Sequence, residues 1–160
     1  MLSKHTNPLS ETPDDNVVRE AIAILEARYG QQTEPHQPFN SPVITKDYLK
    51  LRMSDYQREV FAVMLLDSQH RLIRYEELFY GTIDAAAVYP REVVKLILAR
   101  NAAAVIFAHN HPSGCPEPSD ADRRITVRLK AALATIDIPV LDHLVIGHLD
   151  VVSFAERGWI

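Results

Sequence analysis

The sequence is poor in several features that mark particular classes of protein. Its 160 residues include one cysteine, Cys115, so no internal disulfide can form. Lys and Arg number 17 against 21 Asp and Glu, and the formal net charge of −4 is opposite in sign to the basic surface of proteins that hold nucleic acid through its phosphates. Residues 1–15 lack the apolar core and cleavage site of a secretory signal, and no apolar run approaches the roughly 18 to 20 residues of a membrane span. We therefore expect a cytoplasmic protein that binds no membrane and has no general affinity for DNA.

The composition is that of an ordinary globular chain. Hydrophobic residues make up 47% of it and charged residues 24%, a balance typical of one compact domain. A chain of this length buries roughly 70% of the surface that its unfolded form exposes, so it needs no cross-links to stay folded. We find no internal repeat and no low-complexity tract.

The N-terminal quarter differs from the rest. Residues 1–14 are polar and without periodicity, which predicts a flexible tail. Apolar residues then recur at helical spacing over 15–29, and Gly30 is placed to end that helix. Prolines at 35, 38 and 42 mark a linker. The composition changes at residue 43, so we expect the main domain to span 43–160 after an N-terminal helix and linker over 15–42.

The main domain alternates between strand and helix patterns. A short helix over 43–53 should precede two strands at 59–67 and 71–80, with the first strand buried on both faces. Pro90 can open a helix, which leads to a buried strand at 102–108 and a second helix at 120–135. Two further strands follow at 140–147 and 151–154. This order predicts an α/β fold of the α+β type, with a mixed central sheet flanked by helices.

The segment AHNHPSGCPEPSDAD, residues 108–122, carries the clearest chemistry. His109 and His111 are two apart at the end of a buried strand, so both imidazoles point to the same side. Asp122 lies in the first turn of the next helix, where its carboxylate could complete a three-ligand site with a fourth position open to water, as in catalytic zinc centres. The alternative needs no metal, because Ser119 and Asp122 also form the pattern of a helix capping box.

These residues resemble a known motif. The pattern His, any residue, His-Pro, six residues, Ser, two residues, Asp is that of JAMM metallopeptidases, and His109, His111, Pro112, Ser119 and Asp122 match it. Further blocks at 81–83, 89–114, 141–147 and 152–158 are similar to the RadC family of bacterial JAB/MPN-domain proteins. The resemblance covers the chain from about residue 56 to its end.

The resemblance implies a fold and a set of roles. The JAB/MPN fold is a mixed sheet flanked by helices. By similarity His109, His111 and Asp122 would bind one Zn²⁺ per chain, and Glu59 would be the general acid and base in hydrolysis of a peptide or isopeptide bond. Glu76 and Glu77 are alternatives to Glu59.

Ser119 would donate a hydrogen bond to the developing oxyanion. As a helix cap its oxygen only accepts, so we expect its hydroxyl proton to remain free for this purpose.

Other residues near the motif have open roles. Asn110 stands where many JAMM peptidases carry Ser or Thr, although it suits the RadC block, so the substrates of the eukaryotic deubiquitinases are not carried over. Cys115 is expected to be an exposed loop residue without a role. Asp142 and His143 could orient a ligand, but a satisfied polar pair is the interpretation that we favour.

Two other functions compete with hydrolysis. RadC-like proteins have been labelled as DNA-repair proteins, and the helix at 120–135 has a cationic side that could meet phosphates, but longer members carry a helix-hairpin-helix segment that residues 1–55 do not match. The other alternative is a catalytically silent interaction domain, with the helix at 15–29 as a docking or dimerisation element and a homo-oligomer as one outcome. The cationic residues are Arg123, Arg124, Arg128 and Lys130.

Overall fold

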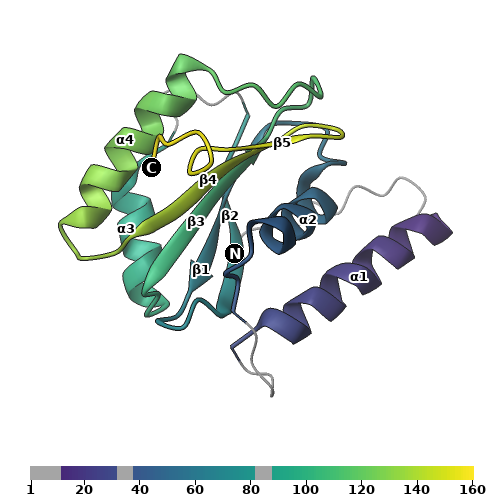
Figure 1. Ribbon diagram of the computed structural model, residues 1–160, viewed down its shortest axis with the longest axis horizontal. Helices are drawn as coiled ribbons and strands as arrows, with labels where there is room; N and C mark the ends of the chain where they lie inside the picture. The colour runs from purple at the N-terminus through teal and green to yellow at the C-terminus, as the bar shows by residue number, and fades with distance from the viewer. Residues whose placement is uncertain (1–11, 32–37, 82–87) are drawn as a thin grey trace.

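The structure is a computed structural model that describes residues 12–31, 38–81 and 88–160. Its described part contains four helices and five strands (Figure 1). In chain order they are α1 (Pro13–Tyr29), α2 (Pro42–Met53), β1 (Val60–Leu66), β2 (Leu72–Tyr80), α3 (Pro90–Ala99), β3 (Ala104–Asn110), α4 (Asp120–Ala134), β4 (Val140–Ile146) and β5 (Val151–Ser153).

The strands form one mixed sheet in the order β2-β1-β3-β4-β5. β1 pairs antiparallel with both β2 and β3, whereas β3 pairs parallel with β4. A parallel pair requires a crossover connection, and α4 supplies it. The predicted mixed sheet flanked by helices is confirmed.

The sheet is covered on both faces (Figure 1), with α1 and α2 on one side and α3 and α4 on the other. β1 and β3 are buried along their whole length, because successive side chains of a strand enter opposite cores. Val60, Ala62 and Met64 belong to the α2 side, and Phe61 and Val63 to the α3–α4 side. These two central strands are therefore packed on both faces up to the ends where the polar side chains lie.

The N-terminal helix begins earlier than the pattern suggested. Thr12 is the N-cap and not part of the predicted tail, because its hydroxyl and backbone form a capping box with Asp15. Pro13 therefore opens α1. Residues 1–11 of the predicted tail and residues 32–37 of the predicted linker lie outside the described residues.

The C-terminal half of α1 packs on the domain itself. Tyr29 is buried, and Glu26 accepts hydrogen bonds from Arg52 (2.5 Å) and Tyr48 (2.7 Å) of α2. Farther toward the N-terminus Val17 is 65% exposed. α1 thus has one end fixed to the sheet layer through α2 and the other end in solvent.

The strand predicted at 102–108 lies two residues later. Asn101 adopts a left-handed backbone (φ 51°), and the backbone N–H of Ala102 donates to the carbonyl of Ile97 (3.1 Å). This arrangement terminates α3, so residues 101 and 102 complete the helix end and β3 starts at Ala104. The shift places His109 inside the strand rather than beyond it.

The described residues contain no helix that is long and apolar enough to cross a membrane.

Candidate metal centre

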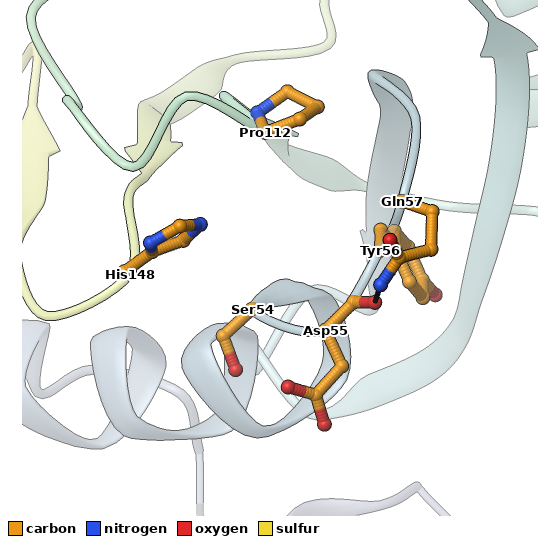
Figure 2. Close-up of a pocket in the computed structure, with 6 residues that line it drawn as sticks. All are labelled: Ser54, Asp55, Tyr56, Gln57, Pro112 and His148. Atoms are coloured by element: carbon orange, nitrogen blue, oxygen red, sulfur yellow. Dashed lines mark hydrogen bonds between the residues drawn. The ribbon is translucent and has the colours of Figure 1, made fainter.

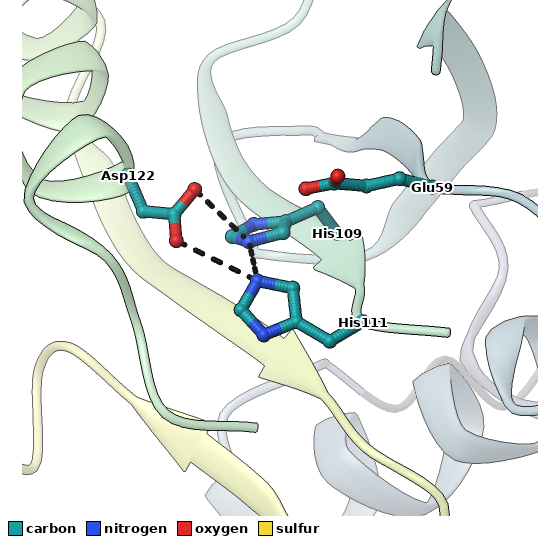
Figure 3. Close-up of side chains that lie close together, drawn as sticks. All are labelled: Glu59, His109, His111 and Asp122. Atoms are coloured by element: carbon teal, nitrogen blue, oxygen red, sulfur yellow. Dashed lines mark hydrogen bonds and ion pairs between the residues drawn. The ribbon is translucent and has the colours of Figure 1, made fainter. Parts of the chain in front are cut away.

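Four side chains with metal-binding atoms meet where β1 begins and β3 ends. They are Glu59, His109, His111 and Asp122, and one ligand atom from each lies within 4.8 Å of the others. Figure 3 shows the carboxylate of Glu59 directed toward His109 while Asp122 approaches from α4. The three ligands predicted from spacing and the glutamate implied by the resemblance are thus brought together.

The topology of the sheet explains this convergence. His109 lies in β3 opposite Phe61 of β1, so Glu59, which immediately precedes β1, comes near the end of β3. His111 follows two residues later and points the same way. Asp122 is the third residue of α4. This helix connects β3 to β4, and its first turn lies near the end of β3. His109 and Asp122 are almost completely buried, whereas the side chain of His111 is 18% exposed.

The distances fit a small cation. The Nε2 atoms of His109 and His111 are 3.0 Å apart, and they lie 3.2 Å and 3.5 Å from the two carboxylate oxygens of Asp122. Ligand atoms about 2.0 to 2.1 Å from a tetrahedral zinc ion are roughly 3.3 Å from one another. The three separations are close to this value, with each imidazole measured to a different oxygen of Asp122.

The hydrogen bonding of His111 supports the same interpretation. Its Nδ1 lies 2.9 Å from the carbonyl oxygen of Cys115. A carbonyl can only accept, so Nδ1 carries a proton, and Nε2 of the neutral ring presents a lone pair to Asp122. A lone pair facing a carboxylate needs a cation between them, which a metal ion or a second proton on the ring would provide.

The pKa values reflect this crowding. The hydrogen bond with Asp122 raises the pKa of His111, against the opposing effect of burial. Burial alone would raise the pKa of Asp122, but the adjacent imidazoles of His109 and His111 and the backbone N–H of Ser119 outweigh it and hold the pKa of this carboxyl well below its ordinary value. The aspartate is therefore ionised at neutral pH, as a metal ligand must be.

Ser119 caps α4 as predicted, but its hydroxyl is engaged differently. Its Oγ accepts from the backbone N–H of Asp122 (3.2 Å) and also lies 2.8 Å from Oδ2 of the same residue. The ionised carboxylate can only accept, so Ser119 donates its proton to Asp122. The expectation that this proton is free for a substrate was wrong, because the carboxylate of the capping box lies within reach of it.

Asn110, between the two histidines, has a role that the sequence did not reveal. Its side chain points away from the two histidines, accepts from the backbone N–H of Val60 (2.8 Å) and donates to the carbonyl of Arg58 (2.9 Å). These two groups flank Glu59. One amide side chain thus ties the backbone of the glutamate to the strand that carries the ligands.

His143 also contacts His109 of the candidate metal centre. Its Nε2 lies 2.8 Å from Nδ1 of His109, and its Nδ1 lies 2.6 Å from the hydroxyl of Thr126. Burial lowers the pKa of His143 well below its ordinary value, so the ring is neutral. Asp142 accepts from the backbone N–H of His143 (2.7 Å), but the side chain of His143 is satisfied by His109 and Thr126 and not by Asp142.

For Asp142 the favoured interpretation as a satisfied polar residue agrees with the structure. Its carboxylate accepts from the hydroxyl of Ser153 (2.5 Å) and from the backbone N–H of Ala155 (2.9 Å). It fastens the residues that follow β5 and does not reach the ligands.

The other candidates lie outside the four-residue group. Glu76 pairs with Arg74 on β2 (2.5 Å), and Glu77 accepts hydrogen bonds from Tyr56 and Tyr80. Cys115 is exposed, as expected. On the cationic side of α4, the guanidinium of Arg123 lies over the ring of Trp159 (4.2 Å to its centroid).

A cavity of about 460 Å³ adjoins the segments that carry the site. Figure 2 shows it between the end of α2 and the loop after β4. Pro112, which follows His111, and Gln57, two residues before Glu59, both line it, together with Ser54, Asp55, Tyr56 and His148.

Comparisons with known proteins agree with the geometry. The family model described as RadC-like JAB domain matches residues 39–159. A "UPF0758 protein" of Shewanella amazonensis is 62% identical over 131 residues, which cover 82% of this chain and 58% of that protein. One of Shewanella baltica is 60% identical over 142 residues, covering 88% of this chain and 63% of its own length. The chain thus spans about three fifths of the curated relatives that it matches.

Proposed function

The chain belongs to the family of RadC-like JAB-domain proteins, and we propose on this basis that it is a zinc-dependent hydrolase of the JAMM metallopeptidase type, with one Zn²⁺ per chain. His109, His111 and Asp122 would hold the ion. The substrate would be a protein or peptide, cleaved at a peptide or isopeptide bond. The observation that carries the proposal is the convergence of two imidazole nitrogens and an ionised carboxylate at separations close to those between the ligands of a tetrahedral zinc ion.

Glu59 is the group that would move the proton. A zinc ion in this site supplies an acidified water and polarises a carbonyl group. Glu59 lies beside the two histidines and Asp122 (Figure 3), where its carboxylate would accept a proton from the attacking water and return it to the leaving amine. Asn110 holds the backbone on both sides of Glu59 in register with the ligands.

Ser119 has a more restricted part in this proposal. Its hydroxyl donates to Asp122, so in the absence of substrate Ser119 orients the carboxylate of that residue. Donation to an oxyanion would require the hydroxyl to rotate away from Asp122. We therefore assign the larger share of catalysis to Glu59.

The cavity beside the site is the place where a side chain of a polypeptide substrate would lie. Its volume of about 460 Å³ is ample for one residue, and Pro112 and Gln57 connect it to His111 and Glu59 along the chain. A segment crossing the ends of β1 and β3 would pass over the ligand group with one side chain in this cavity.

The first experiment measures metal content and then activity. Elemental analysis should find about one zinc per chain in the wild type and almost none in the His109→Ala/His111→Ala double variant, with His148→Ala as a control that removes a histidine outside the ligand group. The zinc-loaded protein is then screened against peptide and isopeptide libraries, with Glu59→Gln as the inactive control. A folded wild type that cannot hold added zinc would overturn the proposal.

Two other outcomes would favour the alternative functions. If zinc binds but no bond is cleaved, the silent interaction domain becomes the better interpretation. Binding to DNA that survives Glu59→Gln and weakens with salt would instead favour the DNA-associated module.

A further inference from the structure

A buried chain of polar groups runs from His109 away from the ligand group. It passes from Nδ1 of His109 to Nε2 of His143 (2.8 Å), from Nδ1 of His143 to the hydroxyl of Thr126 (2.6 Å), and from that hydroxyl to the backbone carbonyl of Asp122 (2.7 Å). His109, His143 and Thr126 are each at most 2% exposed. This series of hydrogen bonds therefore begins at the side chain of one proposed metal ligand, His109, and ends at the backbone of another, Asp122.

The last group in the chain sets the direction of every hydrogen bond before it. The carbonyl of Asp122 has no proton to give, so the hydroxyl of Thr126 must donate to it. The hydroxyl of Thr126 has only this one proton, so toward His143 it must accept. The proton of the His143 ring is therefore on Nδ1.

The neutral ring of His143 then has an unprotonated Nε2. Phe61, Phe107 and Phe154 surround this ring, an apolar environment in which a second proton would be costly. Its Nε2 accepts, so Nδ1 of His109 must donate to it. The remaining nitrogen of His109, Nε2, therefore presents its lone pair to Asp122 and His111.

We infer that His143 and Thr126 are positioning residues for His109, which fix its imidazole as the Nδ1–H tautomer and reserve Nε2 for a metal ion. The metal part of this inference rests on the proposed function. The carbonyl of Cys115 does the same for His111. Both Nε2 lone pairs then face each other at 3.0 Å beside a carboxylate, an arrangement of three acceptors that only a cation satisfies.

Partners of this kind matter for affinity as well as orientation. A hydrogen bond to the second nitrogen of a ligand histidine fixes its tautomer and ring plane, and loss of such a partner typically weakens metal binding 10- to 100-fold. Thr126→Val removes the hydroxyl while keeping the shape of the side chain. His143 could then turn either nitrogen toward His109, and the tautomer of the ligand would no longer be fixed.

Two readouts test the inference separately from catalysis. Long-range ¹H–¹⁵N correlation spectra of the metal-free protein assign the protonated nitrogen of His109, and competition with a chelator gives the zinc affinity. We expect Nδ1–H in the wild type, a tautomer mixture in Thr126→Val, and zinc affinity 10- to 100-fold lower in that variant. Thr126→Ser should restore both.

Thr45→Val is a matched control. Thr45 is also a buried helical threonine, and its hydroxyl donates to the carbonyl four residues earlier (3.2 Å to Ser41), so the same substitution tests the general cost of losing such a bond. It should leave the spectrum of His109 and the zinc affinity unchanged. His143→Phe, which keeps an aromatic ring in an aromatic environment, should reproduce the loss seen in Thr126→Val.

Either of two results would overturn the inference. One is an Nε2–H tautomer of His109 in the metal-free wild type, and the other is zinc affinity in folded Thr126→Val and His143→Phe equal to that of Thr45→Val. A wild type with the Nδ1–H tautomer that fails to bind zinc would contradict the proposed function and leave the assignment of the tautomer standing.

Discussion

Asn110→Ala should uncouple Glu59 from the metal ligands. The variant loses the bond to the backbone N–H of Val60, which is 3% exposed and would be left buried without that partner, at a cost of about 1 to 3 kcal/mol. The bond to the carbonyl of Arg58 is only partly buried, so water can replace it, and its loss costs about 0.5 to 1.5 kcal/mol. We expect a decrease of about 2 to 4 kcal/mol in the free energy of unfolding, or roughly 4 to 16 °C in Tm for a chain of this size.

The function of the variant should change in a characteristic way. His109, His111 and Asp122 are untouched, so zinc content should stay near that of the wild type. Glu59 loses the tie on both sides of its backbone, and a displacement of about 1 Å in a reacting group can lower kcat roughly a hundredfold.

Urea denaturation, elemental analysis and the peptidase assay measure these three effects. Asn40→Ala, at an exposed asparagine of the described chain, is the control. Stability within about 0.5 kcal/mol of that control would refute the reasoning, because it would mean that the two bonds do not hold the start of β1.

Three other predictions concern His111 and the loop that follows it. Zinc affinity, measured by chelator competition, should fall as the pH is lowered through the raised pKa of His111, because below it a proton occupies the nitrogen that the metal needs; an affinity independent of pH between about 8 and 6 would contradict this. Cys115→Ser should bind zinc as tightly as the wild type, since His111 contacts the backbone carbonyl and not the thiol; a large loss would point to the sulfur as a ligand. Gly114→Ala should lower the free energy of unfolding, measured by urea denaturation, by about 1 to 3 kcal/mol, because φ is +87° and a Cβ would lie 2.6 Å from Nδ1 of His148. Gly81→Ala is the control, because its φ is +96° but nothing lies within 4 Å of the added Cβ, so it measures the backbone strain without the clash.

The sequence was sufficient for the parts of the fold that depend on local pattern. β1 is a continuous apolar run, β3 is apolar up to Ala108, and α4 begins at a capping box that the residue types Ser119 and Asp122 already specify. The positions of His109, His111 and Asp122 could be predicted because two of them share one face of a strand and the third opens the next helix.

The groups that support the ligands could not be predicted in the same way. The contact of His143 with His109 depends on the parallel register of β3 and β4, in which Phe107 lies opposite His143, and nothing in the local sequence fixes that register. Asn110 could be expected to point away from His109, but its partners on β1 come from 50 residues away. The donation of Ser119 to Asp122 depended on the rotation of a hydroxyl, which residue spacing does not determine.

The antiparallel pairing of β1 with β3 also governs when the site comes into existence. Val60 and Asn110 are 50 residues apart in the chain, so the glutamate and the ligands meet only after a long loop has closed and the centre of the sheet has formed. The unfolded chain keeps His109, His111 and Asp122 within 14 residues of one another but does not hold them at one point, so an ion binds the native state more tightly than the unfolded one. By mass action, a free metal concentration a thousandfold above its Kd would add at most about 4.1 kcal/mol to the stability of the whole sheet, the more so the less the unfolded chain binds metal, and the abundance of the folded protein would then follow the supply of metal.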